Sequence, residues 1–132
     1  MDKEKQELIL KLSMFEQEMN QLQQQLRVVE QGILELSELN LGLDELKGKT
    51  GKEILAPIGR GIFAKASLIS EELTVDVGSG NLVKKSIPET KELIEEQIKK
   101  LKNVQEEFNN NLEKINEEAA KVIEETEKTE KD

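Results

Sequence analysis

The chain has 132 residues, 36% of them charged and only 2% aromatic, with a net charge of −9 at pH 7. So few bulky residues cannot fill a compact globular core, and binding nucleic acid or an anionic membrane requires clustered Lys and Arg, which are interleaved with Glu here. From this composition we expect one extended unit. His and Cys are absent, which excludes the common general base, the thiolate nucleophile and most zinc sites. We therefore expect that the protein is no enzyme and carries no cofactor.

A heptad repeat predicts a first coiled-coil helix over residues 3–47. Its apolar residues are spaced alternately four and three apart, which is the a/d pattern of a left-handed coiled coil. They are Leu8, Leu12, Phe15, Met19, Leu22, Leu26, Val29, Ile33 and Leu36. Lys47 followed by Gly48 gives this helix a basic last turn and a glycine stop.

Residues 53–86 predict four short strands that form two β-hairpins. Apolar and polar residues alternate there, and glycine-rich turns interrupt them. Four short strands with small residues cannot close a barrel alone, so we expect the hairpins to assemble with other subunits. Pro57 fits an edge or strand-end position, because it cannot donate to a ladder. The expected interface residues are Ile54, Ile58, Ile62, Phe63, Leu68, Leu73, Val75, Val77 and Val83.

Two glycine patterns resemble nucleotide-binding loops but lack the required context. Gly59 and Gly61 could match a dinucleotide-binding turn, yet such a turn must open a helix, and the alternation that follows is typical of a strand. Gly48-Lys49-Thr50 resembles the end of a phosphate loop, which needs a glycine five residues earlier, where Leu43 stands. We therefore expect no nucleotide site.

A second heptad stretch predicts a helix over residues 87–126. Ser86 and Glu89 form a capping-box pattern, with Pro88 in the first turn. The apolar positions are Ile94, Ile98, Leu101, Phe108, Leu112, Ile115, Ala119 and Val122, and Gln105 is the polar member expected to fix the register. The two helices have similar lengths, which favours antiparallel pairing within the chain. The expected fold is α+β, mainly α, with a charged tail over residues 127–132.

The hairpin sequences resemble those of the prefoldin family, in its archaeal alpha-subunit type. The resemblance rests on the runs from Ala56 to Lys65 and from Val75 to Lys85, with coiled-coil arms on both sides. It implies a chaperone that holds unfolded polypeptides without nucleotide, as a hexamer of two alpha and four beta subunits. In such a hexamer the hairpins form a β-barrel platform, while the arms grip substrate at their tips and pass it to a group II chaperonin.

The free end of the predicted arm carries more apolar residues than two paired helices can bury. Leu8 and Leu12 occupy heptad positions, whereas Ile9 and Leu10 do not. We therefore expect unfolded polypeptide to bind at Leu8, Ile9, Leu10, Leu12, Met14, Val122 and Ile123. The alternative interpretation is that these are seam residues and scattered surface side chains.

Two further alternatives concern the whole chain and its charged end. A structural coiled-coil scaffold that oligomerises through its hairpins would show the same periodicity. The run from Glu124 to Asp132 is interpreted as a frayed, solubilising tail, with a chaperonin contact as the alternative. Without a disulfide, membrane-span or leader pattern, the expected location is the cytoplasm.

Overall fold

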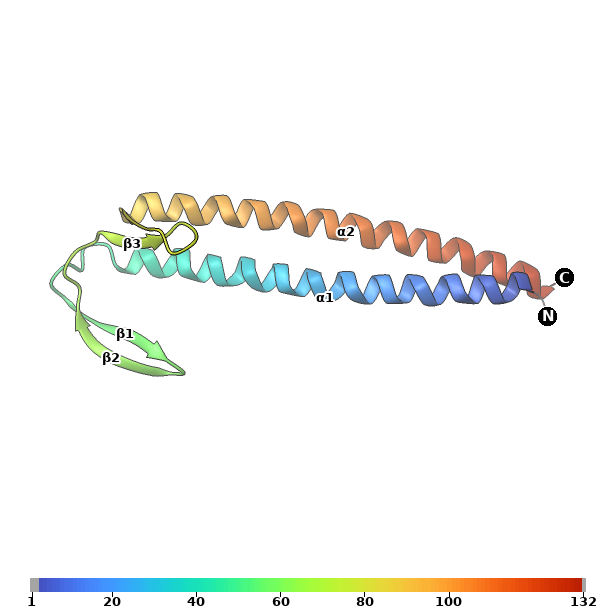
Figure 1. The fold of residues 1–132 in the computed structure, drawn as a ribbon, viewed down its shortest axis with the longest axis horizontal. Coiled ribbons are helices and arrows are strands. Elements are labelled where there is room, and N and C mark those ends of the chain that lie inside the picture. Colours follow the sequence, from blue (N-terminus) through green and yellow to red (C-terminus); the bar gives the residue numbers. More distant parts are fainter. Residues whose placement is uncertain (1–2, 132) are drawn as a thin grey trace. The chain divides into compact units, whose positions relative to one another are not determined.

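The structure, a computed structural model, describes residues 3–131, with side chains through residue 128. Its elements are α1 (Lys3–Glu45), β1 (Glu53–Gly59), β2 (Ile62–Ser67), β3 (Leu73–Asp76), β4 (Leu82–Lys85) and α2 (Ile87–Lys131) (Figure 1). The chain divides into a terminal unit, made of residues up to 33 and from 100 onward, and a middle unit, residues 34–99. The prediction of a mainly helical fold with two hairpins between long helices is confirmed.

In the terminal unit, α1 and α2 run antiparallel. Phe15 of α1 and Val122 of α2 line one hollow, and Leu22 of α1 and Ile115 of α2 line another. Residue numbers along α2 therefore fall as those along α1 rise. Every predicted heptad position in this unit is buried or half-buried, which confirms the seam, as we call the row of a/d residues. The polar seam residue Gln105 donates from Nε2 to a carboxylate oxygen of α1, Glu30 Oε1, at 3.4 Å.

The middle unit contains an apolar core. Leu43 of α1 packs with Ile87 and Ile94 of α2, all less than 9% exposed. Leu73 of β3 also packs against this core. The hairpin β3–β4 is therefore attached to the helices through an apolar side chain, and Figure 1 shows β3 lying beside the ends of α1 and α2 that meet there.

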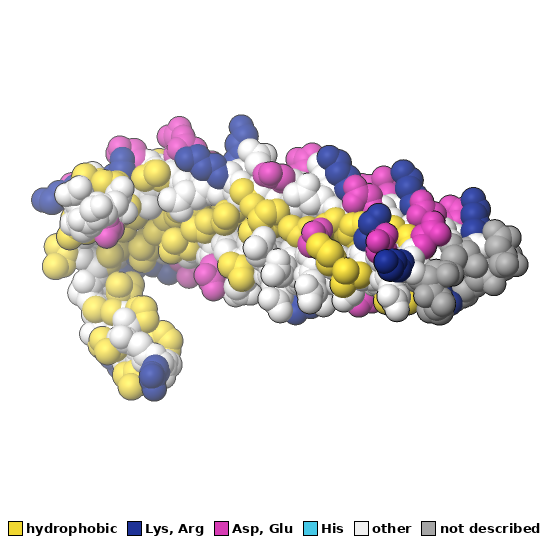
Figure 2. All heavy atoms as spheres, turned by 45° about the vertical axis from the view of Figure 1, so that its right-hand side comes forward, with side chains coloured by type: hydrophobic (Ala, Val, Ile, Leu, Met, Phe, Trp, Pro, Cys, Tyr) yellow, Lys and Arg dark blue, Asp and Glu magenta, His cyan; other side chains and the backbone are white. Residues whose placement is uncertain are grey.

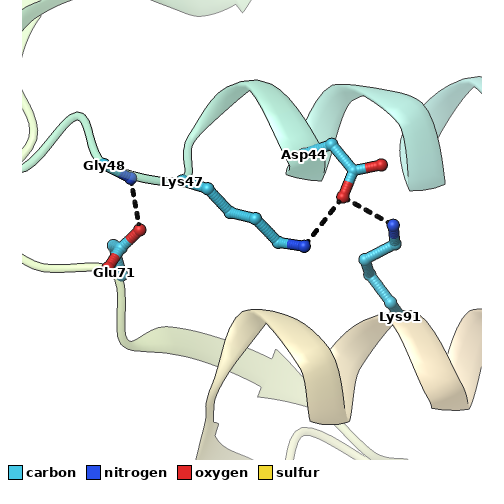
Figure 3. A network of polar contacts seen from close by, with 5 residues as sticks. All are labelled: Asp44, Lys47, Gly48, Glu71 and Lys91. Carbon is cyan, nitrogen blue, oxygen red and sulfur yellow. Dashed lines mark hydrogen bonds and ion pairs between the residues drawn. The ribbon is translucent and has the colours of Figure 1, made fainter.

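Polar contacts fix the end of α1 (Figure 3). Asp44 Oδ1 accepts from Lys91 Nζ at 2.6 Å and lies 3.2 Å from Lys47 Nζ. Hydrogen bonding by Lys91, and next by Lys47, lowers the pKa of Asp44 below its usual 3.8. Gly48 follows with φ of 73°, a conformation that suits glycine, and its N–H donates to Glu71 Oε1 at 2.7 Å.

The start of α2 has the predicted capping box. The Glu89 N–H donates to Ser86 Oγ at 3.2 Å, and the Ser86 N–H donates to Glu89 Oε1 at 3.3 Å. The Ser86 hydroxyl also donates to Glu89 Oε1, at 2.9 Å. These bonds, that from the Ser86 side chain first, lower the pKa of Glu89 below its usual 4.5, because they favour the charged carboxylate.

The hairpins form two separate two-stranded antiparallel sheets, β1–β2 and β3–β4. Gly59, Arg60 and Gly61 all have positive φ, so this glycine pattern is a hairpin turn and opens no helix. The register shifts between Pro57 and Gly59, which leaves Ile58 without a cross-strand partner. In the second hairpin, Val75 pairs with Val83.

The helix ends differ by a few residues from the expected bounds. The predicted first helix extends to residue 47, whereas α1 ends at Glu45 and a turn follows. Where a charged tail is expected over residues 127–132, α2 continues as helix through Lys131. Asp132 lies outside the described residues.

Replacing Ser86 by Ala should lower the free energy of unfolding by about 1 kcal/mol at pH 7, the usual cost of losing an N-cap hydroxyl. Because folding lowers the pKa of Glu89, its stabilising contribution is complete above about 4.5 and is lost as the pH falls through the lowered value. The difference between wild type and Ser86→Ala should therefore narrow below pH 4.5. Urea unfolding followed by circular dichroism measures it. Ser67→Ala, an exposed serine outside the cap, is the control, and a pH-independent difference would contradict the prediction.

Two glycines inside α1 should respond differently to replacement by alanine. A methyl group at Gly42 would have no atom within 4 Å, so Gly42→Ala should stabilise the chain by as much as about 1 kcal/mol through helix propensity. At Gly32 the methyl would meet Leu101 Cδ1 at 3.2 Å, so Gly32→Ala should gain less. Thermal and urea unfolding of the two variants test this order, and equal gains would show that Leu101 moves aside freely.

Candidate functional site

Exposed apolar side chains are distributed unequally between the two helices. Among the described residues, seven large apolar side chains of α1 are exposed, against one of α2, Ile123. The seven are Ile9, Leu10, Met14, Val28, Leu34, Leu39 and Leu41. Since α1 also supplies a complete seam, it has apolar surface beyond what helix pairing uses.

The residues expected to bind unfolded polypeptide fall into two groups in the terminal unit. Ile9, Leu10, Met14 and Ile123 are about half exposed, at 52%, 62%, 54% and 48%. Leu8 and Val122 are buried, and Leu12 is half-buried, all at seam positions. The first group can meet another molecule directly, whereas the second group mainly holds the helices together.

A shallow hollow of about 340 Å³ brings two of these residues together. Met14 and Val122 line it with Phe15, a seam residue that was not expected at the site. Lys11, Glu18, Glu118 and Lys121 complete the lining. Two cations and two carboxylates leave the hollow without net charge, so it can accept an apolar side chain with either sign of charge beside it.

The residues expected at the subunit interface are largely open to solvent. Ile58, Ile62, Phe63, Val77 and Val83 are exposed. Ile54, Leu68, Leu73 and Val75 are half-buried. Figure 2 shows hydrophobic side chains over much of the β1–β2 hairpin. The single chain therefore leaves most of this predicted interface uncovered.

A larger groove of about 700 Å³, not foreseen from the sequence, lies in the middle unit between β3 and the helices. The six consecutive residues Leu73–Gly78 line one side. Among the described residues β3 pairs with β4 only, so its other backbone edge has no strand partner there. Leu36, Leu39 and Leu43 of α1 and Leu93, Ile94, Thr90 and Gln97 of α2 complete the groove. The signal in the sequence was Leu39, an apolar residue off the seam.

The described part of the chain shows no group of His, Cys, Asp or Glu side chains arranged to hold a metal ion. None of its helices is long and apolar enough to span a membrane.

Comparisons with known proteins agree on one family. The prefoldin subunit family model matches residues 15–132, so the expected binding residues from Leu8 to Met14 precede the match. Prefoldin subunit alpha of Methanobrevibacter smithii is 35% identical over 98 residues, which cover 74% of this chain and 67% of the relative. Prefoldin subunit alpha of Archaeoglobus fulgidus is 32% identical over 129 residues, 94% of this chain and 92% of the relative.

A solved structure has the same fold. The filamentous PFD from Methanocaldococcus jannaschii, determined by cryo-electron microscopy, superposes with a TM-score of 0.52 over 95% of this chain and 99% of that chain. The sequences are 19% identical, so this likeness concerns the fold alone. The family model and the archaeal relatives show that the chain belongs to the prefoldin family, whose members are chaperones rather than enzymes and whose alpha subunits assemble with other prefoldin subunits.

Proposed function

We propose that this chain is the alpha subunit of an ATP-independent holdase, which captures unfolded polypeptides on its terminal unit. The observation that carries the proposal is the apolar surface left there after the helices have paired. Ile9, Leu10, Met14 and Ile123 are exposed although the predicted seam positions around them are covered. This surface is not used to hold the helices together, so apolar segments of an unfolded chain can cover it.

The neutral lining of the hollow supports a broad range of clients. Lys11 and Lys121 are balanced by Glu18 and Glu118, so no net charge selects among polypeptides. Met14 adds an unbranched, flexible side chain that adapts to different apolar groups. We therefore propose that clients are recognised by their exposed apolar residues rather than by a sequence.

Holding a client without nucleotide requires several weak contacts at once. One terminal unit offers only a few apolar side chains, so its affinity for a client is low. A hexamer of two alpha and four beta subunits would present six arms to one client, and linked binding can raise avidity by about 10² to 10⁴. Delivery of the client to a group II chaperonin, in the cytoplasm, belongs to the same proposal.

We assign subunit assembly to the hairpins and to the groove beside β3. The free edge of β3 presents unpaired N–H and C=O groups, and a strand from a beta-type subunit would pair with them and cover Leu39 and Val77. In the other hairpin, Pro57 removes one donor from β1, so β2 offers the more complete edge. Pairing at these edges would build the β-barrel platform that the family resemblance implies.

A structural scaffold is the second candidate function. The solved neighbour is described as filamentous, and a filament needs only hairpin-mediated contacts. A scaffold and a holdase would both have the seam and the hairpins. Only a holdase would bind unfolded polypeptide through the exposed apolar residues of the terminal unit. The two candidate functions are therefore distinguished by whether the assembled protein delays aggregation of a client without ATP.

The variant Ile9→Ser, Leu10→Ser, Ile123→Ser should assemble normally but suppress aggregation of a denatured client at least about tenfold less well, since its apolar binding surface is removed. Light scattering of diluted, unfolded citrate synthase, without ATP, measures the effect. The matched control is Val28→Ser, Leu34→Ser, Leu41→Ser, which removes three exposed apolar side chains elsewhere on α1. Full activity in the first variant would reject this binding surface, and no activity in the wild-type assembly would favour the scaffold.

Leu39→Lys should weaken assembly with a beta-type subunit by more than about tenfold, because an added strand would have to bury a charged ammonium group in a mainly apolar groove. Native mass spectrometry across a concentration series measures the hexamer fraction. Leu34→Lys is a close control, since Leu34 and Leu39 are 52% and 51% exposed on the same helix and only Leu39 lines the groove. Equal assembly of both variants would show that no strand occupies the groove.

A further inference from the structure

The part of α1 between Arg27 and Lys47 has an unusual charge pattern. It contains five acidic residues and no Lys or Arg, although the whole chain has 19 basic residues. The acidic residues are Glu30, Glu35, Glu38, Asp44 and Glu45. Near the start of α1, in contrast, Lys3, Glu7 and Lys11 alternate in sign at a spacing of four, so neighbouring charges neutralise one another. The segment between Arg27 and Lys47 lacks such internal compensation.

Two exposed leucines lie on one face of this segment. Leu34 is 52% exposed and Leu41 is 69% exposed. Seven residues turn a helix through about 700°, so the two side chains point within about 20° of each other. Leu39, which lines the groove beside β3, lies about 140° around the helix from Leu34. The leucine pair is therefore separate from the groove, and it lines none of the hollows described above.

Two carboxylates flank the leucine pair without a cation. Glu38 follows Leu34 by one turn, and Glu45 follows Leu41 by one turn, so all four residues share a face. Asp44, in contrast, is paired with Lys47 and Lys91. Within the part of the chain that the structure describes, neither Glu38 nor Glu45 forms a salt bridge. We call Leu34, Glu38, Leu41 and Glu45 the acidic leucine face.

The position of Glu45 adds an electrostatic argument. It is the last residue of α1, and the last turn of this helix has no basic residue. The carboxyl end of a helix carries a partial negative charge, so a carboxylate there is unfavourable and a nearby cation is favourable. Lys47 and Lys91 supply that cation to Asp44, whereas nothing in the described chain supplies one to Glu45.

We propose that the acidic leucine face is a docking site for a basic amphipathic helix of a partner protein. A helix with apolar side chains at a spacing of seven would cover Leu34 and Leu41, and its flanking Lys or Arg side chains would meet Glu38 and Glu45. The carboxylates repel phosphate groups, which argues against nucleic acid or an anionic membrane as the occupant. This site goes beyond client holding and subunit assembly, since it uses neither the terminal unit nor the hairpins.

The test measures binding of a fluorescein-labelled, 18-residue amphipathic helix of Leu and Lys to the full chain by fluorescence anisotropy. A shuffled peptide of the same composition, which forms no apolar face, is the reference probe. The wild-type chain should bind the amphipathic peptide at least about tenfold more tightly than the shuffled one at 0.15 M salt, with weaker binding at higher salt. Equal binding of the two peptides would overturn the proposal.

Two double variants locate the site. Leu34→Ser with Leu41→Ser, and Glu38→Gln with Glu45→Gln, should each weaken binding of the amphipathic peptide about tenfold or more. Val28→Ser, which changes a 73% exposed side chain on α1, is the control and should bind as wild type does. Circular dichroism verifies that all variants remain helical. Undiminished binding by either double variant would overturn the proposal, because the peptide would then lie elsewhere.

Sedimentation of the chain without peptide tests a competing occupant. If Leu34→Ser with Leu41→Ser converts a larger species to a smaller one, the face joins copies of this chain and the proposal is wrong. An unchanged species is the expected result. Client holding is measured separately through Ile9, Leu10 and Ile123, so failure at one surface leaves the other proposal standing.

Discussion

Antiparallel pairing of α1 with α2 along the heptad seam is the interaction on which the rest of the structure depends. In each unit, the predicted seam residues are buried or half-buried, and among them Leu8, Ile94 and Val122 are the most deeply covered. Full burial of such a side chain stabilises by about 1.5–3 kcal/mol, and partial burial by less. The helix pair is therefore held by many modest contributions, and two helices alone have no third element to cover apolar residues placed off the seam.

The hairpins show the consequence of having no such covering element. A two-stranded sheet is marginal by itself, and among the hairpin residues only Leu73 packs against the middle-unit core. The remaining apolar side chains, such as Phe63 and Val77, stay exposed. A free strand edge beside an apolar groove is unfavourable in an isolated subunit, yet it is the feature that strand pairing between subunits requires. The apolar side chains that the hairpins leave exposed in the single subunit are thus the same ones that assembly would bury.

Features set by local spacing could be predicted from the sequence, whereas features set by helix rotation could not. The seam, the Ser86–Glu89 capping box and the Gly59–Gly61 turn depend on residues close in the chain, and the structure contains all three. The groove depends on how far Leu39 turns toward β3, which spacing does not fix. Likewise, Asn40 Oδ1 is buried without a partner among the described residues, while Gln105 donates to Glu30, and no sequence pattern separates these two polar residues.

The two helices contribute differently to recognition. Seven exposed large apolar residues of α1 against one of α2, among the described residues, mean that α2 mainly supplies a seam and a charged outer face. The apolar surfaces of α1 differ in their charge surroundings. The hollow of the terminal unit is neutral, the groove beside β3 has Asp76 as its charged lining residue, and the acidic leucine face has carboxylates only. Apolar contact is non-directional and does not by itself select a partner. The charges beside each apolar surface of α1 can therefore determine whether it binds a client, another subunit or the proposed basic helix of a partner protein.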